Sequence, residues 1–477
     1  MSRVWRVWCA LQASRSTKAR LAPGVSEDSS DYLDALARFV GQTPAQAIPP
    51  AVLARTREIL IDTPPVIAWG MRQPQPSELA RAQLAGQDDA GRAWVIGSGR
   101  TAERVDAGML NGLAGAWLDF DEGNFLANGH PGIQVIPAAL ALAQERRLSG
   151  SALLAAIALS YEVVARIGMA TQTRLIVNPH GTFGVVGSAL ACARLTGLAP
   201  ERLRELASLA ASCCMATNRH TMLNGATVRN WYAGHSGFMG PMALRMIESG
   251  FTGPRDGVNT TFSLVLGEGF SPEVAVADLG QRWLLLEGYL KLYPTARYAH
   301  SAIDALHDAL SKIQTPLRTA DIERMDVRAY KLAAFLSEQA PADWFGTRFS
   351  IPFALATLLV GGRQGLDAFS DEAVADPAVQ ALARRVHVVE APEFTAQYPA
   401  LQRVDLRLQL SDGRVIEGAC HITSGEPQRP HPTEALARKY QDLAVPLWGA
   451  ARAEQLHQAL LDIDHCPDVS QLVDFCP

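Results

Sequence analysis

The stretch SALLAAIALSYEVVARIGM, from Ser151 to Met169, decides the fold class of this chain. Its residues are apolar on nearly every side of a helix, and such a helix has to be buried inside a large protein core. A second apolar segment, Ile136 to Arg147, precedes it, and Leu148-Ser149-Gly150 forms the break between the two. The sequence therefore predicts a mainly helical protein built around this buried segment.

Helical spacing of apolar residues continues outward from this core, from Tyr32 to about Gly250. Pro64-Pro65 follow the helix predicted over Val52 to Ile61 and are expected to end or kink it, because proline lacks an N–H and restricts the preceding residue. The helix predicted over Thr182 to Thr196 should stop at Gly197. Two sets of small residues should let helices approach closely: Gly184, Gly187 and Ser188, and Ala233, Gly237 and Gly240.

The pattern changes after about Leu284, where strands begin to alternate with helices. Val404 to Leu410 alternates strictly between apolar and polar residues, as a half-buried strand does, and Asp412-Gly413 then provides a hairpin turn. From Pro432 to Leu472 the chain is again predicted to be helical and to pack on the first part. Further strands are expected at Met325 to Tyr330, Val386 to Val389 and Arg414 to Ile422, with helices at Ser301 to Ile313 and Phe353 to Leu359.

The composition favours a well-packed protein and excludes some functional classes. The chain has 477 residues, of which 48% are hydrophobic and 19% charged, and a formal net charge of −5. This charge gives no reason to expect a nucleic-acid or membrane-surface partner. No apolar run is expected to reach the roughly 18 residues that a membrane helix needs. The seven cysteines are scattered without a CxxC pair, which favours a reducing compartment and weakens an iron–sulfur or structural zinc interpretation.

Residues 1–28 differ in composition from the rest of the chain. Five basic residues precede the first acidic one, Glu27: Arg3, Arg6, Arg15, Lys18 and Arg20. An Arg-rich, acid-poor start is typical of an organellar transit peptide. The alternatives are a disordered extension or a start codon assigned too far upstream, and these are favoured because the tract is short and lacks a clear cleavage signal. We therefore expect a cytoplasmic protein.

His130 and His180 are the main candidates for acid–base chemistry. His130 ends the polar stretch that begins at Asp119, and His180 lies in Asn178 to Gly184. Each precedes a segment predicted to be helical, and a helix start offers unpaired N–H groups and a positive dipole end. A neutral imidazole at that place suits proton transfer on a small anionic substrate. The alternative is that both rings only cap or pack.

The other candidates also have a functional and a structural interpretation. Asp119 could orient an imidazole, or it could solvate a helix end or form a salt bridge. Arg229 could grip a carboxylate with its two-pronged guanidinium, or it could link helices. We expect Asp121 and Glu122 to be solvated or to cap a helix. Packing or capping is also favoured for His300, and a role in the site is least expected for His220 and His235.

Metal and nucleotide sites are poorly supported by the sequence. There is no HExxH or His-x-His motif, and Asp119-x-Asp121 has no further ligand spaced to complete a cation's shell. The glycines at Gly97-Ser98-Gly99 lack the strand–GxGxxG–helix context of a dinucleotide site. A Gly-x-Ser-x-Gly nucleophile elbow is also missing. We therefore predict no metal.

Six segments, in order along the chain, resemble the MmgE/PrpD family, and the resemblance extends from about Tyr32 to Leu447. That family includes 2-methylcitrate dehydratases, cis-aconitate decarboxylases and an iminodisuccinate epimerase. The segments are Asn111-Gly112 to Glu122, His130-Pro131, His180 before a Gly-rich helix, Gly225 to Asn230, Lys291 to His300, and Phe349 to Phe353.

The resemblance implies a large all-helical domain built from both chain ends, over residues 29–284 and 424–477. It also implies a smaller α+β lid domain over residues 285–423. Most members of the family are dimers, so a homodimer is expected, and most use neither a metal nor an organic cofactor.

Residue by residue, Asp119, His130 and His180 match the family's active-site Asp and its two histidines. Arg229 fills a position where decarboxylase members have Lys, and a hydroxyl-bearing residue of their acidic loop has no counterpart near Gly123. The segment that holds Lys291 and Arg297 faces the cavity in the family, so both are predicted to bind substrate carboxylates. A tyrosine contributed by the lid is matched, with a slipping alignment, to Tyr330.

The leading hypothesis is a cofactor-independent lyase that acts on a small di- or tricarboxylate. A 2-methylcitrate dehydratase-like enzyme is favoured, because the two departures argue against decarboxylase activity specifically. His130 and His180 would be its acid–base pair, Asp119 would orient or assist them, and Arg229 would bind carboxylate. The alternatives are an epimerase, a cis-aconitate-type decarboxylase, or a non-catalytic carboxylate-binding relative.

Overall fold

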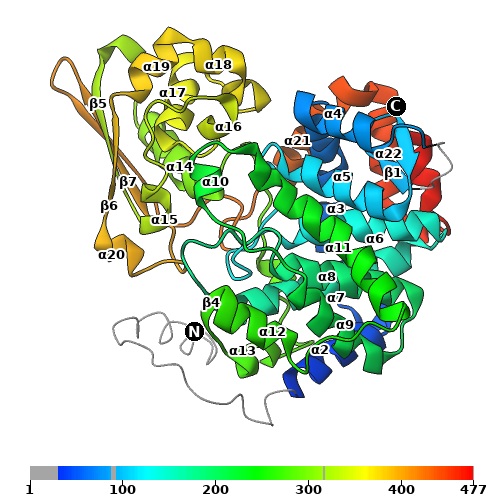
Figure 1. The fold of residues 1–477 in the computed structure, drawn as a ribbon. Helices are drawn as coiled ribbons and strands as arrows, with labels where there is room; N and C mark the ends of the chain where they lie inside the picture. Colours follow the sequence, from blue (N-terminus) through cyan, green and yellow to red (C-terminus); the bar gives the residue numbers. More distant parts are fainter. Residues whose placement is uncertain (1–30, 88–92, 315–316, 476–477) are drawn as a thin grey trace.

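The computed structural model describes residues 31–87, 93–314 and 317–475. Within them the protein is mainly helical, with a small mixed four-stranded sheet in its C-terminal part (Figure 1). The prediction of a mainly helical chain with strands confined largely to its later part is confirmed. The basic stretch 1–28, for which a transit peptide or an extension was considered, lies outside the described residues.

The first half of the chain forms the helical part of the molecule. It also contains two short antiparallel strand pairs, so the expected all-helical domain is corrected: strands of three or four residues are too short to leave an alternating pattern in the sequence. The elements are α2 (Asp31–Gln42), α3 (Pro50–Met71), α4 (Pro74–Gln83), β1 (Ala93–Val95), β2 (Arg100–Ala102), α5 (Arg104–Ala116), α6 (Pro131–Glu145), α7 (Gly150–Ala170), β3 (Thr171–Thr173), α8 (Phe183–Thr196), α9 (Pro200–Ser212), α10 (His220–Leu223), η3 (Thr227–Asn230), α11 (Trp231–Glu248), α12 (Gly257–Asn259), η4 (Thr260–Val265), β4 (Gly267–Phe270) and α13 (Pro272–Val276).

Helix α7 carries the segment that opened the sequence analysis, and it is buried over nearly its whole length. Its two charged residues form an ion pair, since Nε of Arg166 lies 2.7 Å from Oε1 of Glu162. Among the described residues, α7 is the one helix long and apolar enough to cross a membrane, so the expectation that no apolar run has this length was wrong. The protein itself covers 94% of the apolar window, which accounts for its composition as a core helix.

Helix α3 runs through Pro64-Pro65 to Met71, so of the two expectations, that the prolines end the helix or kink it, the first was wrong. Two consecutive prolines remove two helical hydrogen bonds, at a cost of about 3 kcal/mol or more each. Both prolines and the residues that follow, Val66 and Ile67, are buried in the core. Packing of this face therefore offsets the lost hydrogen bonds. The expected stop at Gly197 is confirmed, because it ends α8 with a left-handed φ of 69°.

Small residues bring α11 close to two of its neighbours, as predicted. A Cβ on Gly237 would lie only 2.0 Å from the carbonyl oxygen of Gly108 on α5. A Cβ on Gly240 would lie 2.1 Å from the hydroxyl of Ser188 on α8. These contacts leave no space for a side chain, so the close packing of α5, α8 and α11 depends on glycine at both positions.

The C-terminal part folds around a four-stranded sheet of order β6-β5-β7-β8. Strands β5 and β6 are parallel and the other two pairs are antiparallel, while α14 packs on β7 and β8. The elements are η5 (Leu284–Glu287), α14 (Arg297–Ser311), η6 (Thr319–Asp321), β5 (Ile322–Ala329), α15 (Lys331–Ala334), α16 (Trp344–Thr347), α17 (Ile351–Gly361), η7 (Leu366–Phe369), α18 (Asp371–Ala375), α19 (Pro377–Ala383), β6 (Val386–Glu390), α20 (Pro392–Thr395), β7 (Val404–Leu410) and β8 (Val415–Cys420).

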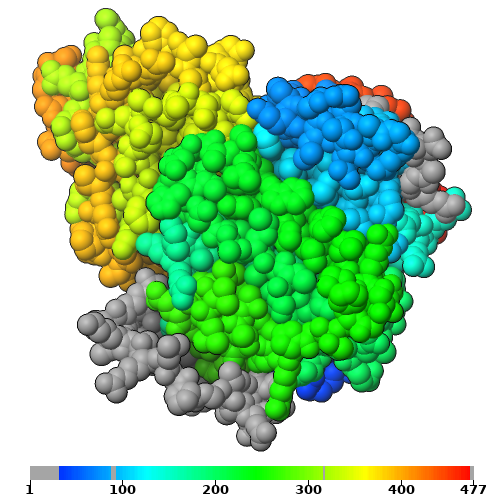
Figure 2. Space-filling model, in the orientation of Figure 1, coloured from blue at the N-terminus to red at the C-terminus, as the bar shows by residue number. Residues whose placement is uncertain are grey.

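After β8 the chain returns to the helical part. Helices α21 (Thr433–Trp448) and α22 (Ala450–Leu461) pack on α3 and are followed by η8 (Ile463–His465) and η9 (Val469–Phe475). Their apolar residues join the same buried cluster as α7, whereas the sheet and α14 form a second cluster. Figure 2 shows the C-terminal part, in yellow to orange, as a lobe against the helical part. The domain limits given above stay a prediction.

Candidate active site

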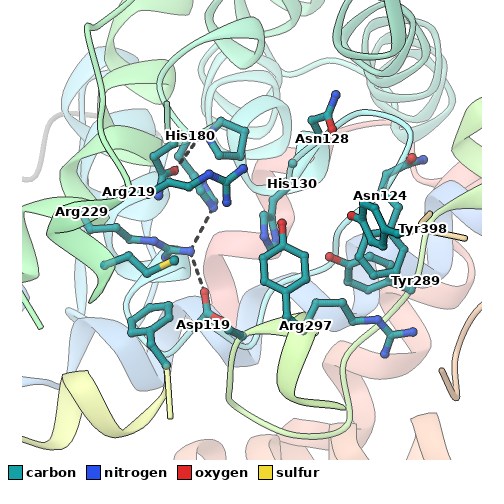
Figure 3. Close-up of a pocket in the computed structure, with 18 residues that line it drawn as sticks. Asp119, Asn124, Asn128, His130, His180, Arg219, Arg229, Tyr289, Arg297 and Tyr398 are labelled. Carbon is teal, nitrogen blue, oxygen red and sulfur yellow. Dashed lines mark hydrogen bonds and ion pairs between the residues drawn. The ribbon is translucent and has the colours of Figure 1, made fainter. Parts of the chain in front are cut away.

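His130 and His180 lie side by side in one pocket. His130 is the residue before α6, and His180 lies in the loop before α8, two helices that pack against each other. Their rings are stacked, with centroids 4.6 Å apart and planes inclined by 23°. Both line a pocket between the helical part and the C-terminal part (Figure 3).

Asp119 is held between two cations. Its backbone is left-handed, with a φ of 50°, and its side chain is buried. Oδ1 lies 2.6 Å from Nη2 of Arg229, and Oδ2 lies 3.1 Å from Nζ of Lys291. Burial alone would raise the pKa of Asp119, but the charges of Lys291 and Arg229 outweigh it and hold the pKa well below its usual range. Asp119 is therefore a carboxylate at neutral pH.

A second buried carboxylate, Asp121, faces His130. Its Oδ2 lies 3.0 Å from Nδ1 of His130, and its Oδ1 lies 3.8 Å from Nζ of Lys291. Burial would raise the pKa of Asp121, but the charges of His130 and Lys291 hold it below its usual range. The expectation that Asp121 is solvated or caps a helix was wrong, since it is buried in an ion pair with the His130 ring.

His180 is fixed in one tautomer by Arg229. Nη2 of Arg229 lies 3.2 Å from Nε2 of His180, and because a guanidinium only donates, Nε2 accepts. The proton of the neutral ring is therefore on Nδ1, which is buried and has no hydrogen-bond partner among the described residues. Burial and the charge of Arg229 both lower the pKa of His180 well below its ordinary value. The ring is neutral at pH 7.

The remaining acid of the stretch, Glu122, caps α6. One of its carboxyl oxygens accepts a hydrogen bond from the backbone N–H of Gly132, and the other lies 3.1 Å from the hydroxyl of Tyr161. Its carbonyl oxygen lies 2.5 Å from Nδ1 of His130. Burial and the neighbouring charge of Asp121 raise the pKa of Glu122 to about 8. Glu122 is therefore a neutral capping group that also positions the His130 ring.

Two residues predicted to bind substrate do not line this pocket. Nζ of Lys291 is fully buried and donates to the carbonyl oxygen of Asp119 at 2.7 Å and to its carboxylate, which leaves it behind the pocket wall. Tyr330 is also buried, with its ring stacked on Tyr398 at 4.9 Å. Here the sequence could not reveal which tyrosine of the C-terminal part reaches the pocket, because the answer depends on packing between distant segments.

The predicted carboxylate binders Arg229 and Arg297 line the pocket but are already paired. Arg229 donates through Nη1 to the carbonyl oxygen of Ala116 and through Nη2 to Asp119 and His180. Nη2 of Arg297 lies 2.6 Å from Oε1 of Glu426. Arg297 also contacts Nδ1 of His300, whose other nitrogen bonds the carbonyl oxygen of Thr295, so His300 packs as expected.

His235 and His220 stay outside the site. Nε2 of His235 is bonded to the carbonyl oxygen of Cys213, and His220 is exposed on α10. Neither lines the pocket. The residues that do, and that the sequence did not single out, are mainly amides, aromatic residues and one further arginine: Asn124, Phe125, Asn128, Asn178, Arg219, Met222, Tyr289, Tyr298, Phe349 and Tyr398. No motif marks them, because they come from separate loops and helices that converge only in the folded chain.

The groups best placed to hold a metal ion are Asp121, His130 and His180, which can each offer one ligand atom within 4.8 Å of the others. Three features oppose this use. The imidazole rings are stacked rather than splayed around a common point, and Nε2 of His180 accepts from Arg229. Lys291 and Arg229 also place two positive charges beside the acids. The donor set is therefore better suited to proton transfer than to a cation.

Family models place this arrangement in a known class. Residues 34–267 match the MmgE/PrpD N-terminal domain and residues 293–464 match the MmgE/PrpD C-terminal domain. The chain therefore belongs to the MmgE/PrpD family, as the six segments of sequence predicted.

Relatives of known activity share about a quarter of the residues. A cis-aconitate decarboxylase of Aspergillus terreus is 24% identical over 460 residues, which cover 90% of this chain and 93% of that protein. The cis-aconitate decarboxylase of Homo sapiens is 24% identical over 385 residues, 77% of this chain and 78% of that protein. A 2-methylcitrate dehydratase of Cupriavidus necator is 25% identical over 389 residues, 76% of this chain and 79% of that protein.

Proposed function

We propose that this protein is a lyase that acts on a small tricarboxylate by proton transfer at the His130–His180 pair. The observation that carries the proposal is the stacking of the two rings at 4.6 Å in one pocket, with different partners on each. His130 faces the carboxylate of Asp121, whereas His180 faces the guanidinium of Arg229. The two rings therefore differ in their electrostatic surroundings, as the two members of an acid–base pair do. In this proposal the C-terminal part acts as the lid that closes the pocket.

Decarboxylation of cis-aconitate is the first reaction to test, because decarboxylases match the chain over more of its length than dehydratases do. In such a step the carboxylate on the CH₂ group leaves as CO₂, and its bonding pair forms a new C=C bond. The former alkene CH carbon then takes up a proton. His130 and His180 are the groups positioned to supply that proton, and Asp119 holds Arg229 against His180. This changes the preference that the sequence alone gave for a dehydratase.

Dehydration of 2-methylcitrate is the second candidate, and one observation favours it. Elimination of water needs a base for the C–H proton and an acid for the leaving hydroxyl, and the two rings have opposite electrostatic surroundings. Arg229 stands where decarboxylase members have Lys, and their hydroxyl-bearing residue has no counterpart near Gly123, so both departures also weigh against decarboxylation.

The test is an assay of the purified protein against cis-aconitate, 2-methylcitrate and iminodisuccinate, with products identified by NMR and CO₂ release measured. We expect CO₂ release from cis-aconitate, and we expect His180→Gln to abolish it. His465→Gln is the matched control, because the side chain of His465 is 84% exposed and does not line the pocket. Turnover of none of the three compounds would refute the proposal, and dehydration alone would favour the second candidate.

A further inference from the structure

The pocket contains one arginine whose guanidinium is not committed to the protein. Arg219 immediately precedes α10, and its backbone N–H is bonded to the carbonyl oxygen of Ile176 at 2.7 Å. Its side chain lines the pocket with His130 and His180. Among the described residues the guanidinium has no hydrogen bond or ion pair, and its Nε is buried without a partner. Figure 3 draws Arg219 beside His180, across the pocket from Arg297.

Each of the other described cations of the site is paired with a carboxylate of the protein. Lys291 and Arg229 are matched by the carboxylates of Asp119 and Asp121, and Arg297 is matched by Glu426. A bidentate grip on a substrate carboxylate needs two free N–H groups on the same side of a guanidinium. Arg229 and Arg297 have already used their Nη atoms, so neither has this pair available. Among the described arginines that line the pocket, only Arg219 has two guanidinium N–H groups available for a bidentate pair.

A second donor lies close to Arg219 in the fold. Asn178 lines the same pocket, and its Oδ1 accepts from the backbone N–H of His180. Its amide Nδ2 therefore remains as a donor with no partner among the described residues. The carbonyl oxygen of Asn178 is in turn bonded by Thr217, which lies two positions before Arg219. This bond ties the Asn178 loop to the segment that presents Arg219.

We infer that Arg219, assisted by Asn178, anchors one carboxylate of the substrate and so sets its position over the two histidines. This inference rests on the proposed function and replaces Arg229 as the carboxylate-binding residue. A partly buried cation without a partner is costly, and a bound carboxylate removes that cost by a charge-assisted pair. Because the other described cations of the pocket are paired with carboxylates of the protein, the guanidinium of Arg219 is the group by which the pocket selects its ligand. A ligand that lacks the anchored carboxylate loses most of its affinity.

The test is equilibrium binding of propane-1,2,3-tricarboxylate, which cannot be turned over, to the full chain by calorimetry. Arg219→Gln should weaken binding by about tenfold or more, since a hydrogen bond to a charged group is worth about 1.5–3 kcal/mol. Arg219→Lys should weaken it less, because the charge remains without the fork. Arg384→Gln, an exposed arginine of the C-terminal part, is the control and should bind as the unmodified protein does.

A second measurement separates anchoring from a structural effect. Butyrate, a monocarboxylate, should bind the unmodified protein weakly and Arg219→Gln more weakly still, whereas butyramide should bind both alike because it has no carboxylate to anchor. The melting temperature of Arg219→Gln should stay within a few degrees of the unmodified protein's. Equal affinity of both proteins for the tricarboxylate would overturn the inference, and so would a large fall in melting temperature with equal loss of every ligand. The binding data decide this even if no substrate is turned over.

Discussion

Nη2 of Arg229 reaches both Oδ1 of Asp119 and Nε2 of His180, at 2.6 and 3.2 Å. The guanidinium thus connects a carboxylate that stays charged to an imidazole that stays neutral. Since arginine cannot accept a hydrogen bond, this contact alone determines which nitrogen of His180 carries the proton. The structure therefore places Arg229 where it orients the His180 ring and is already paired within the protein.

Arg229→Gln is expected to lower kcat more than it raises KM. The glutamine amide can donate or accept, so it no longer fixes the tautomer of His180, and Asp119 loses one of its two cations. We expect kcat to fall by about tenfold or more, from the loss of one charge-assisted hydrogen bond. Steady-state kinetics measures both constants. A rise in KM with unchanged kcat would instead support the carboxylate-binding role that the sequence suggested.

His180→Gln is expected to reduce turnover by about 10²–10⁴-fold, the usual contribution of a general acid–base group. Binding of propane-1,2,3-tricarboxylate should persist, because the ring is not the anchor proposed above. Calorimetry and rate measurements on the same preparation separate the two effects. Unchanged turnover would remove His180 from the chemistry, and His465→Gln serves again as the exposed control.

Lys291→Met is expected to cost stability rather than substrate affinity. Nζ of Lys291 is fully buried between Asp119 and Asp121, and removal of one partner from a buried ion pair typically costs about 3–5 kcal/mol. Urea unfolding should show this loss, and a second change, Asp119→Asn, should restore part of it. Lys331→Met, at an exposed position, is the control. A large rise in KM at nearly unchanged stability would contradict this expectation.

Glu122 should make the protein less stable as the pH rises towards 8. Its pKa is raised to about 8 in the folded state, against about 4.3 in an unfolded chain. Its stabilising contribution is complete below the unfolded pKa and is lost as the pH rises through the folded pKa, by up to about 1.4 kcal/mol per pH unit.

Glu122→Gln removes that titration, because the amide stays neutral and can still cap Gly132 through its oxygen. The difference in the free energy of unfolding between variant and unmodified protein should grow in favour of the variant from pH 5 to pH 8. Urea unfolding at several pH values measures it, with the exposed Glu454→Gln as control. A difference that does not change with pH would show that Glu122 is ionised in the folded protein.

Tyr398→Phe and Tyr330→Phe form a matched pair. The rings stack on each other at 4.9 Å, but only Tyr398 lines the pocket. Loss of the Tyr398 hydroxyl should change kcat or KM, whereas loss of the Tyr330 hydroxyl, which is buried and does not line the pocket, should leave both within about twofold. Steady-state kinetics on both variants measures these effects on kcat and KM. The reverse result would restore Tyr330 as the lid tyrosine.

Local pattern was sufficient for much of the fold. The apolar segment of α7, the stop at Gly197 and the alternation of β7 are properties of a few consecutive residues, so each was predicted before any contact was known. The passage of α3 through Pro64-Pro65 was not, because it depends on what packs around the prolines. The bounds of α7 were predicted, but its apolar character over the length of a membrane helix was not, because its two charged residues, Glu162 and Arg166, interrupt the apolar run and form an ion pair only in the folded helix.

For the site, the sequence by itself determined which histidines precede helices and to which family the chain belongs. Only the tertiary structure decided which charges are free, because ion pairs such as Arg297 with Glu426 join residues far apart in the chain. For that reason the guanidinium of Arg229 is already paired within the protein, whereas that of Arg219 is available to a ligand. Pairing energies depend on distance and burial in space, and neither quantity can be read from a residue's neighbours in sequence.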